Sequence, residues 1–210
     1  MNPNQLSFFQ ENKQNTMRND LAQINSISGL AYIENFISPQ EHEEIWNNVY
    51  AAPWLGDLKR RVQHYGYKYD YRKRAIDHSM FLGEIPDWSV KYAQRLVDKG
   101  YISVIPDQII VNEYTPGQGI ADHIDCEPCF ADTVISLSLG SEVIMQLKEK
   151  RKRTNKIDVL LEPNSLIILK EDARYKWTHG IPSRKTDSFN GEKLTRQRRI
   201  SLTFRKVKLV

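Results

Sequence analysis

The second half of the chain constrains the fold most, because it holds a succession of short apolar segments with no helical pattern between them. Each segment is rich in β-branched residues and ends at Gly, Pro, Asn or a charged turn, which is typical of β-strands. They are QIIVNEY, TVISLSL, EVIMQL, KIDVLL, SLIILK and RISLTFRKV, with a tight turn expected at LGSE (139–142). Successive strands of this kind predict a mainly β (α+β) domain built on a sandwich or barrel.

Two helices are predicted in the first half of the chain, outside these strands. The stretch SPQEHEEIWNNVYAA begins with Ser38 as N-cap, Pro39 at the first helical position and Glu41 three residues after the cap. This combination is the signature of a capping box. A second helix is predicted over DWSVKYAQRLVDKG, where large apolar residues recur every four positions and Gly100 is placed to end the helix.

The composition fits one globular domain with an N-terminal extension. The chain has 210 residues, of which 40% are hydrophobic and 27% charged, enough to form a core. Residues 1–28 are polar and are expected to form a flexible arm, with a single domain over 29–210. The sequence has no membrane-spanning run or signal peptide pattern, so we expect an intracellular protein, cytoplasmic or nuclear. We also expect a monomer that has no membrane partner.

Two cysteines, Cys126 and Cys129, are the only ones in the chain. A tetrahedral zinc site would need two further ligands, and a single pair cannot form a disulfide framework. We therefore expect two free thiols beside a functional loop.

An alternating row of tyrosines is the most unusual local feature of the chain. Tyr65, Tyr67, Tyr69 and Tyr71 occupy every second position, so on one strand their rings would share a face. Three cations precede the row (Lys59, Arg60, Arg61) and three follow it (Arg72, Lys73, Arg74). Taken alone, the row favours a half-buried hairpin strand, because aromatic stripes are usually part of a core. It also fits a surface that stacks bases and neutralises phosphates.

A second basic segment lies between two predicted strands. The stretch KEKRKRTNK, residues 148–156, has six cations and one acid. It fits a solvated hairpin tip or a loop that contacts phosphates.

The motif HID and a distant histidine suggest a metal site. His123 and Asp125 alternate at the end of a predicted strand and would face the same way, and His179 in WTHGI would arrive from another strand. Two imidazoles and one carboxylate form the facial triad of non-haem Fe(II) oxygenases, which leaves coordination positions open for a co-substrate and O₂.

The last predicted strand suggests a carboxylate pocket. Its residues Arg199, Ser201, Thr203 and Arg205 share one face, while apolar residues share the other. A guanidinium can hold a carboxylate by two parallel hydrogen bonds. On another strand Asn112 and Tyr114 form a further pair of donors on one face.

The ordered set N-x-Y, H-x-D, H-G-I and R-x-x-x-x-x-R resembles the AlkB family of Fe(II)- and 2-oxoglutarate-dependent dioxygenases over about residues 30–207. The resemblance implies a double-stranded β-helix (jelly-roll) core with the N-terminal helices packed outside. It implies that His123, Asp125 and His179 bind Fe(II) and act with 2-oxoglutarate and O₂. It also implies a co-substrate site formed by Asn112, Tyr114, Arg199, Ser201 and Arg205, in which Ser201 stands where many relatives have Asn.

The resemblance also gives the tyrosine row a role. The segment of about residues 56–80 resembles the family's nucleotide-recognition lid, which implies substrate contacts from Arg61, Tyr65, Tyr67 and Tyr69. Glu127 resembles an acidic residue of base-repair members that accepts a hydrogen bond from an exocyclic amine. The expected partner is therefore single-stranded DNA or RNA, and the expected reaction is oxidative demethylation of N-alkylated bases.

Two other functions stay open. The amino-acid sequences of several segments most resemble the tRNA-modifying branch of the family, which hydroxylates a wobble uridine. Some relatives act on proteins, so the chain could also be a protein-directed oxygenase, although such an enzyme has no need of a basic, tyrosine-rich lid.

Overall fold

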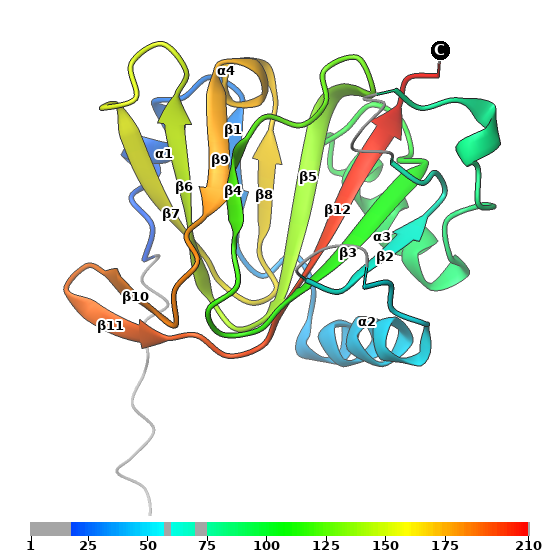
Figure 1. Ribbon diagram of the computed structural model, residues 1–210, viewed down its shortest axis with the longest axis horizontal. Helices are drawn as coiled ribbons and strands as arrows, with labels where there is room; N and C mark the ends of the chain where they lie inside the picture. Colours follow the sequence, from blue (N-terminus) through cyan, green and yellow to red (C-terminus); the bar gives the residue numbers. More distant parts are fainter. Residues whose placement is uncertain (1–17, 57–59, 70–74, 210) are drawn as a thin grey trace, which may run out of the picture.

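A computed structural model describes residues 18–56, 60–69 and 75–209 of the chain. Two antiparallel sheets face each other and form the predicted double-stranded β-helix (Figure 1). The large sheet has the order β1-β8-β5-β12-β3-β2, and the small sheet has the order β4-β9-β6-β7. The prediction of a mainly β, jelly-roll domain is confirmed.

Six strands of the two sheets coincide with the six apolar segments of the sequence, namely β3, β5, β6, β7, β8 and β12. The large sheet consists of β1 (Leu30–Ile33), β2 (Val62–Tyr65), β3 (Gln108–Tyr114), β5 (Phe130–Gly140), β8 (Leu166–Leu169) and β12 (Arg199–Val207). The small sheet consists of β4 (Ile120–His123), β6 (Val143–Glu149), β7 (Lys156–Leu161) and β9 (Trp177–Ile181). A separate hairpin joins β10 (Thr186–Phe189) and β11 (Glu192–Thr195).

Four α-helices and one 3₁₀ turn are found in the described residues: α1 (Leu21–Asn25), α2 (Pro39–Ala51), α3 (Asp87–Asp98), α4 (Glu171–Tyr175) and η1 (His78–Met80). The predicted capping box of α2 is present. The Ser38 hydroxyl accepts from the Glu41 amide at 3.2 Å, and the Glu41 carboxylate accepts from the Ser38 amide at 2.9 Å. Gly100 follows α3 with a φ of 70°, which is the left-handed conformation of a helix C-terminus.

The strand β12 separates the apolar core from the interior of the barrel. Its residues Ile200, Leu202 and Phe204 are fully buried in a core shared with α2 and α3, behind the large sheet. Because neighbouring side chains of a strand point to opposite faces, Arg199 and Arg205 point into the barrel. A second core lies between the two sheets and includes residues of β5, β6, β7, β8 and α1.

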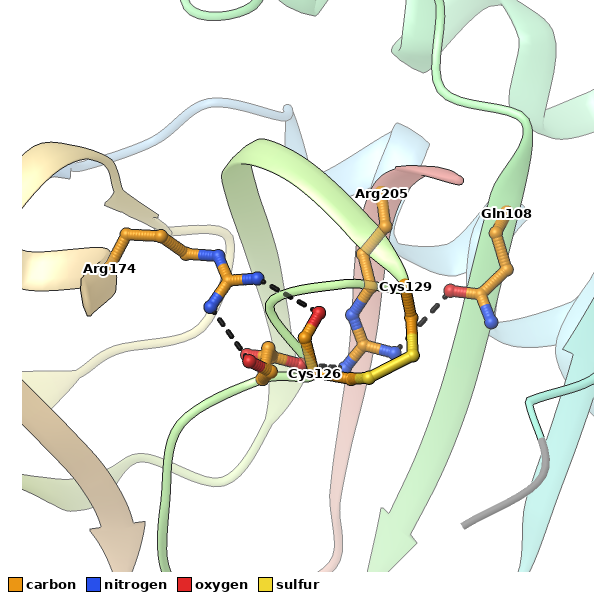
Figure 2. The surroundings of a disulfide bond; sticks show 6 residues. Gln108, Cys126, Cys129, Arg174 and Arg205 are labelled. Atoms are coloured by element: carbon orange, nitrogen blue, oxygen red, sulfur yellow. Dashed lines mark hydrogen bonds and ion pairs between the residues drawn. A yellow bond between two sulfur atoms is a disulfide. The ribbon is translucent and has the colours of Figure 1, made fainter. Parts of the chain in front are cut away.

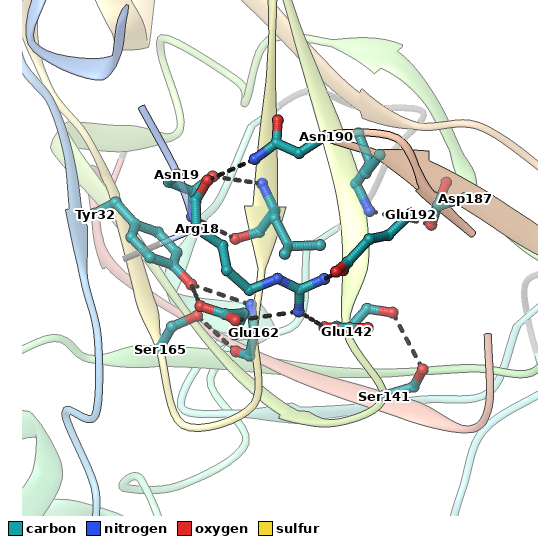
Figure 3. Close-up of polar contacts among 12 residues, drawn as sticks. Arg18, Asn19, Tyr32, Ser141, Glu142, Glu162, Ser165, Asp187, Asn190 and Glu192 are labelled. Carbon is teal, nitrogen blue, oxygen red and sulfur yellow. Dashed lines mark hydrogen bonds and ion pairs between the residues drawn. The ribbon is translucent and has the colours of Figure 1, made fainter. Parts of the chain in front are cut away.

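Part of the predicted N-terminal arm is packed against the barrel. Arg18 lies within 3.4 Å of three glutamates from distant loops and strands (Figure 3), namely Glu142, Glu162 and Glu192. The Asn19 amide group makes two hydrogen bonds with the backbone of Leu160. Two apolar residues of this segment, Ile24 and Ile27, enter the inter-sheet core. The expectation of a flexible segment is therefore wrong for residues 18–28, and residues 1–17 lie outside the described residues.

The tyrosines do not form a single row. The strand β2 ends at Tyr65, and Gly66 has a φ of 76°. A Cβ atom at Gly66 would lie 1.8 Å from the Asp107 carbonyl oxygen, so only glycine fits there. The left-handed residue turns the chain and sends the next tyrosines elsewhere. Tyr71 and five of its flanking residues, Lys59, Asp70 and Arg72–Arg74, lie outside the described residues.

No helix in the described part of the chain combines the length and apolar character needed to cross a membrane.

Candidate active site

Two strands of the small sheet bring the predicted triad together. His123 ends β4 and is paired in register with His179 of β9, with ring centroids 4.4 Å apart. Asp125 follows two residues later, in the β4–β5 loop. One ligand atom from each of the three side chains lies within 4.8 Å of the others. This spacing is compatible with one metal ion held on one face.

The local environment keeps the triad ready to bind a metal. The Nδ1 atom of His123 lies 2.9 Å from the Ala121 carbonyl oxygen, so an N–H there leaves Nε2 as the free ligand atom. Burial and the neighbouring His123 lower the pKa of His179 to about 4, which keeps its imidazole neutral. Burial alone would raise the pKa of Asp125, but Arg205 holds it well below its usual range. Asp125 and His179 are thus in the protonation states that metal binding requires.

Two arginines hold the carboxylate ligand in place (Figure 2). The Nη2 atom of Arg205 lies 2.5 Å from an Asp125 carboxylate oxygen. Arg174 of α4 is only 2% exposed and donates to the backbone carbonyls of Asp125 at 2.9 Å and Cys126 at 3.3 Å. Sequence reasoning missed Arg174, because a single arginine in a five-residue helix gives no local signal of burial.

The structure joins Cys126 and Cys129 in a disulfide, so the expectation of two free thiols is wrong. The intervening turn explains the pairing, since the Cys129 amide donates to the Cys126 carbonyl at 3.2 Å and the two Cα atoms lie 5.2 Å apart. This separation is within the range that a disulfide needs. The bond lies directly after Asp125 and beside Arg205 (Figure 2), where it closes the β4–β5 loop.

A cavity of about 930 Å³ extends from the triad into the barrel. Its floor is formed by alternate residues of β3 and β12, namely Ile110, Asn112, Tyr114, Arg199, Ser201, Thr203 and Arg205. The two strands pair in register, with Arg199 opposite Tyr114 and Ser201 opposite Asn112. Every residue predicted for the co-substrate site therefore lines one cavity.

Arg199 carries unsatisfied donors at the floor. It is 3% exposed, and its Nη2 atom donates to the Ser138 hydroxyl at 2.8 Å. Its Nε and Nη1 atoms are buried without a partner, and burial lowers its pKa to about 10. A buried cation with free donors and no carboxylate partner is costly. An anionic group with two oxygens, such as the distal carboxylate of 2-oxoglutarate, would satisfy it.

Arg60, and not Arg61, reaches the cavity. Its Nε atom donates to the Asn112 side-chain oxygen at 2.8 Å, and its guanidinium lies 5.5 Å from the Tyr114 ring centroid. Arg61 forms two hydrogen bonds with Glu113 on the other face of β3, at 2.6 and 2.8 Å. Both arginines belong to one basic cluster, and only the strand register decides which of them faces inward.

The mouth of the cavity contains two of the other residues predicted for substrate contact. Tyr69 and Glu127 line the cavity, and the Tyr69 ring lies 5.4 Å from that of Phe130. Tyr65 instead packs edge-on against Trp88 behind the large sheet. Tyr67 packs against Phe81, with ring centroids 5.0 Å apart. Of the described tyrosines of the row, only Tyr69 lines the cavity.

Comparison with known proteins agrees with this geometry. A family model described as the 2OG-Fe(II) oxygenase superfamily matches residues 29–205. The chain belongs to this superfamily. Its relatives place it in the AlkB family within the superfamily.

Three relatives define the similarity. "Uncharacterized protein L905" of Acanthamoeba polyphaga mimivirus is 37% identical, over 87% of this chain and 86% of that protein. "tRNA (carboxymethyluridine(34)-5-O)-methyltransferase alkbh8" of Xenopus tropicalis is 35% identical over 86% of this chain but only 32% of its own length. "Probable RNA/DNA demethylase ALKBH6" of Danio rerio is 28% identical over 84% of both chains. The chain thus spans about a third of the frog relative.

A solved structure shows the same fold. "The structure of OsALKBH1" superposes with a TM-score of 0.66 at 18% identity, over 85% of this chain and 96% of that one. The superfamily implies Fe(II), 2-oxoglutarate and O₂. The triad and the two free donors of the Arg199 guanidinium fit the metal and the co-substrate, and the protein is therefore a dioxygenase.

Proposed function

We propose that the protein oxidises an alkyl group on a nucleobase in single-stranded DNA or RNA, with oxidative demethylation of N-alkylated bases as the main reaction. One observation carries the proposal. A single cavity holds the predicted metal triad, an arginine with two free donors at its floor, and an aromatic ring and a carboxylate at its mouth. This order suits a co-substrate below the metal and a base above it.

Bound Fe(II), 2-oxoglutarate and O₂ supply the oxidising chemistry. The chain supplies binding and orientation. In the proposed arrangement Arg199 holds the distal carboxylate of the co-substrate, and Asn112, Tyr114 and Ser201 surround it from the paired strands. Arg205 keeps Asp125 ionised and fixes one of its oxygens, which leaves the other free for the metal.

The mouth would hold the base. The partly buried Tyr69 is supported from behind by Phe130, so its ring can stack on a base without adjusting its position. Glu127 is exposed on the β4–β5 loop and lines the same cavity. Its carboxylate can accept a hydrogen bond from an exocyclic amine, as adenine and cytosine offer.

The names of the relatives support a nucleic acid substrate. The zebrafish relative is named a probable RNA/DNA demethylase, and an Arabidopsis relative, 35% identical over 87% of this chain, is named an alkylated DNA repair protein. A second candidate reaction is hydroxylation of a modified wobble uridine in tRNA. It is favoured by the 35% identity to the frog relative, whose name refers to that tRNA position.

A mass-spectrometric turnover assay tests the proposal. Protein loaded with Fe(II) would be given 2-oxoglutarate and air with three substrates: methylated single-stranded DNA, the same lesions in RNA, and tRNA with a modified wobble uridine. Loss of a methyl mass with release of formaldehyde would support demethylation. Addition of one oxygen to the tRNA alone would support the second candidate. Succinate formed without change in any substrate would overturn both and direct the search to proteins.

A further inference from the structure

The loop between β6 and β7 carries the densest group of exposed cations in the described residues. Lys150, Arg151, Lys152 and Arg153 follow one another, all are exposed, and Lys156 begins the returning strand. We call residues 150–156 the basic hairpin. The dioxygenase chemistry described above makes no use of this segment.

The charge of the basic hairpin is not compensated locally. Among the described residues, no carboxylate lies within 4.0 Å of the cationic groups of Lys150, Arg151, Lys152 or Arg153. The adjacent acid, Glu149, accepts a hydrogen bond from Asn155 at 2.9 Å instead. Some other surface lysines have a carboxylate partner, such as Lys91, which lies 2.5 Å from Glu44. A cluster of unpaired cations produces a positive potential that attracts anions.

The basic hairpin is anchored at the rim of the cavity. Lys150 itself lines the cavity, and its amide donates to the Lys176 carbonyl at 2.8 Å. Thr178, two residues after Lys176 and one before His179, donates to the Lys148 carbonyl at 3.1 Å. In Figure 1 the β6–β7 loop, α4 and the β4–β5 loop all lie at the upper end of the barrel. The cations therefore stand at the end of the barrel that carries Asp125 and Glu127.

The basic hairpin and the aromatic residue of the mouth belong to different sheets. Tyr69 packs on Phe130 of the large sheet, whereas the hairpin extends from the small sheet. Tyr69 and Lys150 line the same cavity, so it has the ring near one sheet and the start of the hairpin on the other. A strand that places one base in a pocket continues past both rims, so its phosphates need cations away from the stacked base.

We propose that the basic hairpin binds the sugar–phosphate backbone of the single-stranded nucleic acid whose base occupies the cavity. This inference rests on the proposed function and extends it, because it assigns one rim of the cavity to the phosphates that flank the target base. The contact is with the backbone, so it raises affinity for any sequence and carries no base preference.

The test is a binding titration over a range of salt concentrations. The triple variant Arg151→Gln/Lys152→Gln/Arg153→Gln would be compared with the wild type by fluorescence anisotropy, using a labelled single-stranded RNA of about 12 nucleotides. Three lost phosphate contacts should reduce the slope of log affinity against log salt by about 2. Affinity near 0.1 M salt should fall on the order of 10- to 100-fold.

A matched control removes the same charge elsewhere. Lys91, Lys99 and Lys193 are exposed and do not line the cavity, so Lys91→Gln/Lys99→Gln/Lys193→Gln should leave the salt slope nearly unchanged. In turnover assays the hairpin variant should raise KM for the oligonucleotide without lowering kcat. Equal Tm values would show that neither variant is misfolded.

Two results would overturn the inference, and they are distinguishable. If the wild type binds and oxidises the RNA but the hairpin variant has the same salt slope, only the role of the hairpin fails. If the wild type neither binds nor oxidises nucleic acid, the proposed function fails as well. Hairpin-dependent binding to polyglutamate that is tighter than binding to RNA would also overturn it, in favour of an acidic protein partner.

Discussion

The floor and the mouth of the cavity are built in different ways. The floor consists of β3 and β12, two long strands that pair over seven consecutive positions, from Arg199 opposite Tyr114 to Arg205 opposite Gln108. The mouth consists of the end of a four-residue strand, a glycine turn and the β4–β5 loop. Paired strands fix side chains by register, so the part that serves the shared chemistry is rigid. Loops allow the substrate side to vary without disturbing the floor.

The largest effect is expected at the metal triad, where floor and mouth meet. The substitution His123→Ala removes one ligand and should abolish both succinate formation and substrate oxidation. The fold should survive, because His123 is the last residue of a short strand and is only partly buried. Isothermal titration with Fe(II) or Mn(II) and thermal melts would check metal binding and folding separately. His78→Ala, at an exposed site, is the control. Undiminished turnover in His123→Ala would exclude this residue from the metal site.

A substitution of Arg199 in the floor should weaken binding of the co-substrate and of nothing else. Arg199→Met removes the guanidinium while filling similar volume, and it should raise the KM for 2-oxoglutarate at least about 30-fold, the effect of losing one partner of a buried ion pair. The Tm should not fall, because a charge that is buried without a carboxylate partner does not stabilise the fold. The cost of this burial is seen in the pKa of Arg199, which burial lowers to about 10.

Arg196 is the matched control for this variant. It is 5% exposed, and its Nε lies 2.6 Å from the buried Asp187 carboxylate. Arg196→Met should therefore lower the Tm, because it leaves Asp187 buried without its main partner. If Arg199→Met lowered the Tm as much as Arg196→Met does, the floor arginine would be structural.

A substitution of Tyr69 in the mouth should weaken binding of the nucleic acid and of nothing else. Tyr69→Ala removes the ring that lines the cavity and should weaken oligonucleotide binding by about 10- to 100-fold, the effect of one stacked base. The KM for 2-oxoglutarate should stay the same, and Tyr69→Phe should retain most of the affinity. Tyr67→Ala, which removes a ring packed on Phe81, is the control. Equal losses in Tyr69→Ala and Tyr67→Ala would contradict the distinction between them.

The smallest effect concerns the helices behind the floor. Arg95 donates to the Glu41 carboxylate and lowers the pKa of Glu41 to about 2 from 4.5. The unfolded chain takes up the proton first, so the stabilisation is complete above pH 4.5 and is lost as the pH falls toward 2. Glu41→Gln removes the charge of this partly exposed ion pair and should lower the free energy of unfolding at pH 7 by up to about 1 kcal/mol. Urea titrations should show that this difference shrinks below pH 4.5 and disappears as the pH reaches about 2. A difference that did not depend on pH would exclude the ion pair as its source.

The sequence predicted the floor better than the mouth, for a physical reason. The alternation of Arg199, Ser201 and Arg205 with apolar residues fixes which face of β12 enters the barrel, and the capping box fixes the start of α2. Both are local patterns. The tyrosine row also alternates, but Gly66 is left-handed and turns the chain. It packs against the Asp107 carbonyl, which lies far away in sequence, so no local pattern reveals the turn.

The other corrections have the same origin. Arg18 is held by glutamates more than 120 residues away, and Arg174 is buried by backbone carbonyls almost 50 residues away. Nothing near either arginine in the sequence signals such partners. The predicted lid remains incomplete as well, since residues 57–59 and 70–74 lie outside the described residues.

Arg174 connects the predicted metal site to the N-terminal segment, because it contacts Asp125 and belongs to a helix that is hydrogen-bonded to residues 28 and 29. The short helix α4 that carries it is held by two backbone hydrogen bonds, from Lys170 to the Gly29 carbonyl at 2.9 Å and from Ala173 to the Ser28 carbonyl at 3.0 Å. A Cβ atom at Gly29 would lie 2.2 Å from the Lys170 carbonyl oxygen. A side chain there must displace α4, and with it the guanidinium that positions Asp125. We therefore expect that a residue remote from both substrate and co-substrate limits how accurately the iron is held.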